Sequence, residues 1–297
     1  AELRANNGGT PDEIAGLINK AITANPTEVP PRLALIQYWL QQKDNKKAMA
    51  AANDAVAAFP DKPEVLDALG RVQQVSGDLN QALSTYGKLA SLQPLSPLAH
   101  LRMAEIHVAN KAKDEAAKSL KKALEIKPDL LEAQRGLILL ALDGKRTGEA
   151  LSIARDVQKQ RPKEPAGQIL EGDIHASQKN WNEAIAAYRN ALKTTPATEL
   201  AVKTHTAILA SGNTSEAEKF AANWSKDHPK DIAFRVYQGD LATARKDYAG
   251  AIQHYNNALA QQPNNALVLN NLAWVSGEIK SPKALEYAEK ANQLAPN

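Results

Sequence analysis

Cysteine is absent from this chain of 297 residues, which excludes disulfides, thiol catalysis and thiolate metal sites. Aromatic residues make up only 5% of it, and no apolar run approaches the length of a membrane span. The formal net charge of +3 is too small to require nucleic acid or an anionic membrane as a partner. The opening residues, AELRANNGGTPDE, lack the basic segment and apolar core of a signal peptide. Alanine, in contrast, is abundant, which is typical of closely packed helices.

Prolines set an internal period. Their spacing is 34 or 33 residues along the series Pro26, Pro60, Pro94, Pro128, Pro162, Pro196, Pro229, Pro263 and Pro296. Alanine stands twelve residues before each of the last eight prolines, at Ala48, Ala82, Ala116, Ala150, Ala184, Ala217, Ala251 and Ala284. This regularity predicts a repeat array in which each unit contacts only its neighbours.

Each period reads as two helices. In residues 63–77, Val65, Leu69 and Val72 follow helical spacing, and Gly77 ends the segment. A second amphipathic segment follows at once and ends at Pro94, because proline cannot continue a helix. The connection between the two segments is short, so the pair is predicted to pack antiparallel.

This pattern resembles the tetratricopeptide repeat, a unit of 34 residues with small residues near positions 8, 20 and 27 and proline at position 32. The alanines above occupy position 20. Position 8 is small in five units, at Gly70, Ala104, Gly172, Gly239 and Ala273, and position 24 is Tyr86, Tyr188 or Tyr255 in three. The resemblance implies an all-α, right-handed superhelical solenoid of antiparallel helix pairs, a tetratricopeptide array in which the large residue at position 24 fills the joint with the next unit.

The period divides the chain into a partial repeat and eight full ones. Residues 1–28 are expected to hold mainly a second helix, after at most a stub of a first helix at residues 1–6. The tandem units are expected at 29–62, 63–96, 97–130, 131–164, 165–197, 198–231, 232–265 and 266–297. Ile36 and Ile138 at position 8 predict slightly splayed pairs, and His205 near position 8 predicts irregular stacking in the sixth unit. Because no helix follows Pro296, we expect either excision from a longer array or an uncapped C-terminal end that self-associates.

No catalytic or cofactor-binding motif is present in the sequence. The six histidines form no HExxH motif and lack the acidic or sulfur neighbours of a zinc site. Glycine-rich phosphate loops and a GxSxG nucleophile motif are also missing. We therefore expect a non-catalytic protein without a metal ion or cofactor.

Any binding surface is expected on the first helices, which in this family line a concave groove and bind ligands through positions 2, 5, 6, 9, 12 and 13. Those positions carry more acids than bases, mixed with apolar side chains. The candidate groove residues are Asp67, Arg71, Leu101, Glu105, Arg135, Leu139, Asp173, Val236, Asp240, Asn270 and Trp274. Such a surface suits a peptide or protein segment and disfavours nucleic acid. The alternatives are that the acids form only a solvated face and that Trp274 packs in the core.

Two functions follow from these observations. The first is a protein-interaction scaffold that binds a peptide or protein in this acidic and apolar groove, within a larger bacterial assembly. The second rests on residues 266–297, which are similar to the late repeats of long bacterial tetratricopeptide proteins associated with exopolysaccharide export and PEP-CTERM protein sorting. That resemblance implies a module of the cell envelope or periplasm that contacts glycan or a glycosyltransferase. Without it, a cytoplasmic location is expected.

Overall fold

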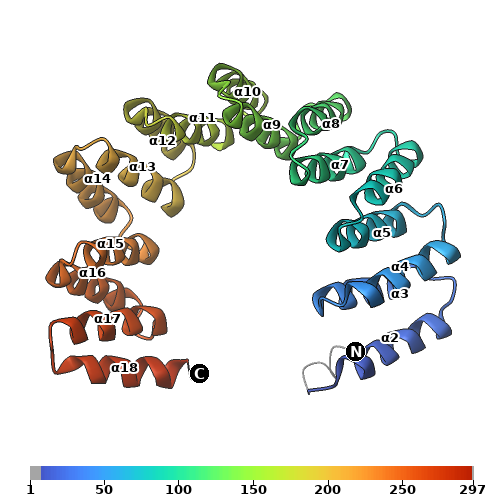
Figure 1. Ribbon diagram of the computed structural model, residues 1–297. Coiled ribbons are helices and arrows are strands. Elements are labelled where there is room, and N and C mark those ends of the chain that lie inside the picture. Colours follow the sequence, from blue (N-terminus) through green and yellow to red (C-terminus); the bar gives the residue numbers. More distant parts are fainter. Residues whose placement is uncertain (1–7, 296–297) are drawn as a thin grey trace. The chain divides into compact units, whose positions relative to one another are not determined.

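The computed structural model describes residues 8–295 (Figure 1), in which every regular element is an α-helix. The expected stub at residues 1–6, and Pro296 with Asn297, lie outside this range. The helices are α2 (Pro11–Ala24), α3 (Pro30–Gln41), α4 (Asn45–Ala58), α5 (Pro63–Ser76), α6 (Leu79–Leu92), α7 (Leu98–Ala109), α8 (Lys113–Ile126), α9 (Leu131–Asp143), α10 (Thr147–Gln160), α11 (Ala166–Ser177), α12 (Trp181–Thr194), α13 (Thr198–Ala210), α14 (Thr214–Asp227), α15 (Ile232–Ala244), α16 (Tyr248–Gln261), α17 (Ala266–Glu278) and α18 (Lys283–Leu294).

The helices belong to two compact units, unit 1 up to Ile153 and unit 2 from Ala154, and the boundary falls inside α10. Within unit 1, α3, α5 and α7 lie on one side, and α4, α6 and α8 lie on the other (Figure 1). Within unit 2, α13, α15 and α17 form one such row and α14, α16 and α18 the second. Each unit is therefore a stack of antiparallel helix pairs, with one face made by first helices and one by second helices.

Local signals fix where the helices begin. Thr10 and Glu13 form a capping box at the start of α2, with Pro11 at its first position. Asp231 caps α15 by accepting a hydrogen bond from the backbone N–H of Phe234. These caps satisfy N–H groups that have no partner inside a helix.

The turn inside each pair contains one residue in the left-handed region. Lysine occupies that place in six turns, with φ between 54° and 61°, at Lys43, Lys111, Lys145, Lys179, Lys246 and Lys280. Glycine takes it in the other two, at Gly77 and Gly212. A side chain there costs about 1–2 kcal/mol relative to right-handed backbone. A cation just after a helix C-terminus recovers about 0.3–1 kcal/mol from the helix dipole.

The alanine column marks where the paired helices approach each other. Seven of its members have no exposed area: Ala48, Ala82, Ala116, Ala150, Ala184, Ala217 and Ala251. A larger residue at these places would separate the backbones, because protein interiors are close-packed. The fixed interval between proline and alanine is thus explained by packing.

Position 8 and position 24 of one pair touch directly. A Cβ added to Gly70 would lie 2.5 Å from the Tyr86 ring, and one added to Gly239 would lie 2.4 Å from the Tyr255 ring. The Tyr86 ring also belongs to a buried cluster with Ala99 and Ile106 of the next helix. The tyrosine therefore fills the joint with the next unit, as expected, and also the space above its own glycine.

Where the residue at position 8 is larger, the residue sixteen places later is smaller. Ala104 and Leu120 share one buried cluster, and Ile36 and Ala52 share another. His205 is followed at the same interval by Ala221. The total side-chain volume of these three joints is thus close to that of a glycine–tyrosine joint, and cores tolerate volume-conserving exchanges best. Ile36 and Ala52 pack in one buried cluster, and the slight splay of their pair stays a prediction.

Candidate partner-binding surfaces

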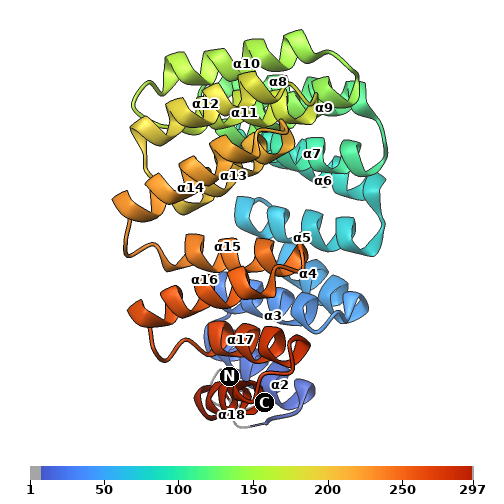
Figure 2. The same cartoon turned by 90° about the vertical axis from the view of Figure 1, so that its left-hand side faces the viewer.

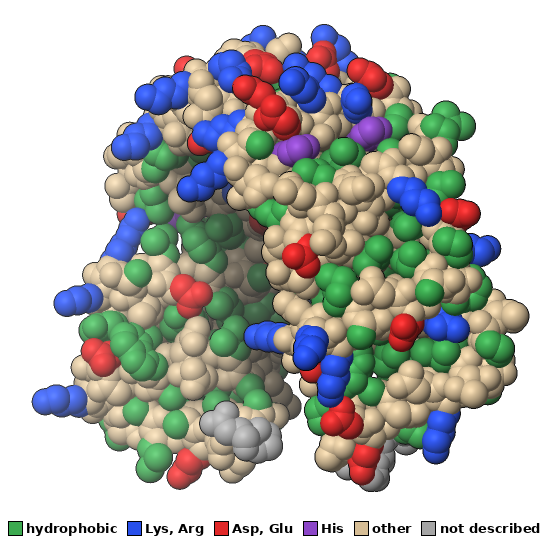
Figure 3. All heavy atoms as spheres, turned by 45° about the vertical axis from the view of Figure 1, so that its right-hand side comes forward, with side chains coloured by type: hydrophobic (Ala, Val, Ile, Leu, Met, Phe, Trp, Pro, Cys, Tyr) green, Lys and Arg blue, Asp and Glu red, His purple; other side chains and the backbone are tan. Residues whose placement is uncertain are grey.

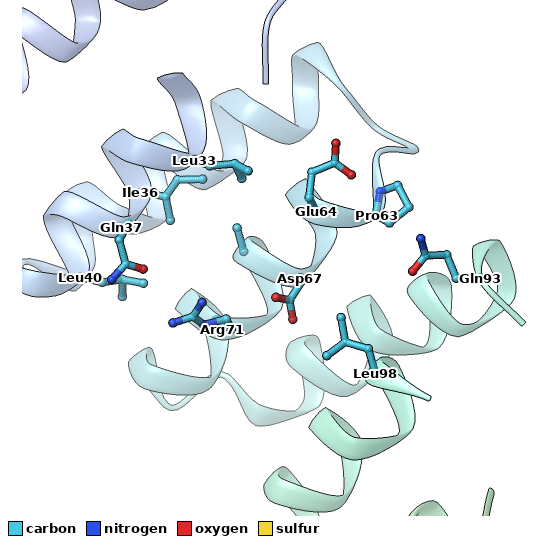
Figure 4. Close-up of a pocket in the computed structure, with 11 residues that line it drawn as sticks. Leu33, Ile36, Gln37, Leu40, Pro63, Glu64, Asp67, Arg71, Gln93 and Leu98 are labelled. Carbon is cyan, nitrogen blue, oxygen red and sulfur yellow. The ribbon is translucent and has the colours of Figure 1, made fainter. Parts of the chain in front are cut away.

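A pocket of about 420 Å³ opens on the first-helix face of unit 1 (Figure 4). Helices α3, α5 and α7 and the loop after α6 supply its lining, which is Leu33, Ile36, Gln37, Leu40, Pro63, Glu64, Asp67, Ala68, Arg71, Gln93 and Leu98. Leu33 and Leu40 come from one helix and Leu98 from another, with charged groups between them (Figure 4). The pocket thus offers apolar contacts and charged groups together.

The carboxylates of this face are partly neutralised from within the protein. Arg102 Nε donates a hydrogen bond to Asp67 Oδ1 at 3.2 Å, and Arg102 Nη1 donates one to Glu105 Oε1 at 3.2 Å. Two carboxylates therefore share one guanidinium, and the group keeps a net charge of −1. The side chains of Asp67 and Arg102 are only 20% and 27% exposed, so this pair is less screened by solvent than a surface ion pair.

The other candidates of unit 1 divide by burial. Arg71, Glu105 and Arg135 are exposed, and Leu139 is 67% exposed on α9. Leu101, in contrast, is only 8% exposed, so its assignment to the groove is wrong. It packs in a buried cluster with Ala104, Leu120 and Leu137, because the next helix pair covers this side of α7. Gln93 was missed because it lies in the loop between pairs, outside the first-helix positions.

Asp173 in unit 2 is engaged by its neighbours. It accepts hydrogen bonds from Tyr188 Oη and from Lys203 Nζ, both at 2.7 Å. Burial of the phenol, followed by the hydrogen bond to Asp173, raises the pKa of Tyr188. The Asp173 carboxylate therefore links α11, α12 and α13, and its charge is balanced by Lys203.

A second pocket, of about 520 Å³, lies on the first-helix face of α15 and α17. Asp240 accepts hydrogen bonds from Tyr255 Oη at 2.7 Å and from Asn271 Nδ2 at 3.2 Å. Burial is the main cause that raises the pKa of Tyr255 to about 12, so this phenol stays a donor. No cation pairs with Asp240 in the part of the chain that the structure describes, so its negative charge is left uncompensated.

Trp274 forms one wall of that second pocket. Its side chain is 53% exposed, and its ring meets the Tyr248 ring edge-on at 6.3 Å. Core packing of Trp274 is therefore excluded. Asn270 is exposed beside it, and Val236 is half-buried against the cluster of Ala242, Tyr255 and Val268.

His205 is a buried polar residue whose surroundings the sequence did not reveal. It is 5% exposed, and its Nδ1 lies 2.8 Å from Tyr237 Oη. Phe220 and Phe234 also face its ring. The density of aromatic residues between positions 220 and 237 was the available signal.

Residues 8–295 contain no cluster of three or more histidine and acidic side chains that could bind a metal ion. On the face shown in Figure 3, histidine side chains lie among apolar and charged ones. None of the described helices combines the length and the apolar character that crossing a membrane requires.

A mouse protein, "Tetratricopeptide repeat protein 21A", is 24% identical over 296 residues, which cover 89% of this chain. The chain spans only 22% of the length of that relative. The crystal structure of the yeast Tom70 superposes with a TM-score of 0.59 at 14% identity, covering 93% of this chain and 61% of that one. A tetratricopeptide repeat protein from Parabacteroides merdae superposes with a TM-score of 0.50 at 15% identity, covering 83% and 98%.

The model described as "Tetratricopeptide repeat" matches residues 68–130 and 135–198, and one described as "TPR repeat" matches residues 239–275. Together these matches cover more than half of the chain, and the structural neighbours confirm the expected all-α repeat fold. The chain therefore belongs to the tetratricopeptide repeat family.

Proposed function

We propose that the chain is a non-catalytic scaffold that binds a peptide or protein segment on its first-helix faces. Tetratricopeptide repeats are in general protein-interaction scaffolds without catalytic activity. The observation that carries the proposal is the pocket of unit 1, where Leu33, Leu40 and Leu98 surround Glu64 and Asp67. Apolar contacts supply affinity in such a site, and a few charged groups fix the orientation of the ligand.

Arg71 also lines this pocket, and with it the charged groups around the pocket sum to −1, which favours a partner with a basic residue. Glu64 is exposed and pairs with no cation in the described part of the chain. The group of Asp67, Glu105 and Arg102 keeps one net negative charge. Phosphate groups of a nucleic acid would be repelled by the same carboxylates. We therefore infer a peptide with apolar anchors and a neighbouring lysine or arginine as the ligand of unit 1.

A peptide-display selection on the purified protein tests this proposal. Selected peptides are expected to contain apolar residues next to a basic one. They should bind Glu64→Lys at least tenfold more weakly than the unmodified protein, because the ligand cation then faces a like charge. Asp54→Lys is the matched control, since Asp54 is exposed on the second helix α4 and the charge change is the same. Peptides that bind Glu64→Lys and the unmodified protein equally well would refute the location.

The pocket around Trp274 supports a second candidate function, contact with a glycan. A half-exposed indole offers a flat apolar face to a sugar ring, and Asp240, Asn270 and Asn271 offer acceptors and donors to hydroxyl groups. This candidate includes the bacterial envelope location and the exopolysaccharide assembly inferred above. A glycan-array signal that Trp274→Ala abolishes would support it, whereas an array without any specific signal would exclude it.

A further inference from the structure

A trough of about 590 Å³ lies on unit 2, with α15 as its floor and α14 and α16 as its walls. Figure 2 shows α15 running between these two helices. The floor residues Arg235, Gln238, Ala242 and Arg245 recur every three or four places, so they share one side of α15. At 3.6 residues per turn, that side is roughly opposite to the one that carries Asp240. The trough is thus separate from the pockets of the proposed function.

The side chains that line the trough from α14 are mostly short. Ala217, Ala221 and Ala222 line the trough from this helix. Ala221 stands at the place where α6, α12 and α16 each carry a tyrosine, and His205 fills the joint from the other helix instead. The short side chains of these alanines leave room between α14 and α16.

The two arginines stand at opposite ends of this floor. They are ten residues apart, with Arg235 on α15 and Arg245 as its C-cap residue, which corresponds to about 15 Å along the helix axis. The Arg245 guanidinium makes no hydrogen bond or ion pair with other residues of the described range. Arg235 Nη2 donates to the backbone oxygen of Pro229 at 3.0 Å, and Arg235 Nε is buried without a partner. The exposed Arg245 therefore presents free donors at one end of the trough, and the half-buried Arg235 adds a positive charge at the other end.

The acidic residues of the trough do not neutralise these arginines. Asp247 accepts a hydrogen bond from the backbone N–H of Gly250 at 3.0 Å, which caps α16. Glu218 is exposed on the α14 wall. Gln253 and Asn257 line the α16 wall, and their amides can both donate to and accept from a peptide backbone. The trough thus combines two cationic ends with walls suited to main-chain hydrogen bonds.

We propose that this trough binds an extended acidic peptide with two carboxylates four residues apart. In an extended chain, residues i and i+4 lie on the same face and are separated by about 13 Å, which matches the distance between the arginines. Residue i+2 lies on that face too and meets Leu241 and Ala242 at the middle of the floor, so a small apolar side chain fits there. Arginine binds carboxylates through two parallel hydrogen bonds, which fixes the register of the peptide.

Fluorescence anisotropy with labelled peptides tests the proposal on the complete chain. The peptide GESVSEG places two glutamates at the required spacing around a valine. It is expected to bind at least tenfold more tightly than GQSVSQG, which lacks the charges, and than GEESVSG, which has adjacent glutamates. The affinity for GESVSEG should fall with rising salt concentration, because charged pairs at an open trough are screened.

Variants locate the binding. Arg245→Gln should weaken the binding of GESVSEG at least tenfold, and Arg155→Gln should leave it unchanged, since Arg155 is exposed on α10 of the same unit but outside the trough. Equal affinities for GESVSEG and GQSVSQG, no binding of either, or unchanged binding by Arg245→Gln would overturn the proposal. Glu64→Lys changes the pocket of unit 1 and should not affect the binding of GESVSEG, so the two proposals can fail independently.

Discussion

Acidification should destabilise the aromatic cluster around His205. The imidazole is almost fully buried, and its Nδ1 is engaged by Tyr237, whose hydroxyl also lies 3.1 Å from Thr206 Oγ1. Burial, and then repulsion from Arg245, lowers the pKa of His205 from 6.5 to about 4. The folded protein therefore holds this imidazole neutral at pH values where an unfolded chain would protonate it.

The size of the effect follows from that pKa difference. Because the folded pKa is depressed, the unfolded state takes up the proton first, and stability falls as the pH drops from about 6.5 to about 4. Above about pH 7 the imidazole is neutral in both states and contributes no pH dependence. The total loss is about 3 kcal/mol at about 1.4 kcal/mol per pKa unit, and about 2.5 kcal/mol of it is reached at pH 4.5.

Urea denaturation at pH 7.5 and pH 4.5 measures this loss. Repeat arrays unfold locally, so the probe must sit in the cluster. Trp224 is suitable, since its ring lies 6.0 Å from that of Phe234, and the other three tryptophans can be replaced by phenylalanine. The control is His205→Gln, which keeps a hydrogen-bonding group but does not titrate.

Comparison of the two proteins isolates the histidine, because carboxylates titrate in both. The free energy of unfolding is expected to fall by about 2.5 kcal/mol more in the parent than in His205→Gln between the two pH values. An extra loss below about 0.5 kcal/mol, or an NMR titration of the His205 ring near its ordinary pKa, would refute the reasoning.

Other substitutions test the packing and the turns by urea denaturation. Gly239→Ala should destabilise unit 2 by about 1–3 kcal/mol, because the new methyl group meets the Tyr255 ring, and adding Tyr255→Leu should restore part of that loss. Additive effects of the two changes would contradict a direct contact. Asp231→Ala should cost about 2–4 kcal/mol, since its carboxylate accepts hydrogen bonds from Trp224 Nε1, Thr198 Oγ1 and a backbone N–H. Lys111→Gly should stabilise unit 1 by up to about 1 kcal/mol, and a clear loss of stability would show that the side chain outweighs the left-handed backbone.

The fold was largely predictable because its constraints repeat. Each joint needs a small residue where the helices cross and a residue that stops the second helix, so alanine and proline recur at fixed intervals. A single unit would have carried a weak signal, but eight successive units made it unambiguous. The left-handed lysines were not foreseen, since lysine has no special preference for that backbone region.

The repeat positions predicted which side of the helices the candidate residues occupy, but not the basic residues of the protein that pair with them. Asp67 and Asp173 face the expected side, yet each is paired with a basic residue about one repeat further on, Arg102 or Lys203. Such pairs depend on the rotation between successive helix pairs, which the repeat length does not specify. Burial of Leu101 has the same origin, because the next pair covers it.

The trough of unit 2 was beyond the sequence analysis for a different reason. Its α14 wall is lined by Ala217, Ala221 and Ala222, and alanine also stands at the place of Ala221 on α4 and α10. Short side chains such as alanine form no recognisable sequence motif for a binding site. The pattern of His205 followed by Ala221 does not single out this place, because Ile36 is followed by Ala52 at the same interval.

The size exchange between position 8 and position 24 also limits how such a chain can evolve. The two residues that must fit each other lie on different helices of one pair, as in Gly172 and Tyr188. Recombination that moves a whole helix pair carries a matched couple with it. Recombination inside the turn would combine the first helix of one pair with the second helix of another. Glycine at position 8 with alanine at position 24 would leave a cavity, and histidine with tyrosine would clash. The smallest heritable module of this protein is therefore the helix pair, and duplication of pairs is the route by which the array can lengthen without repacking.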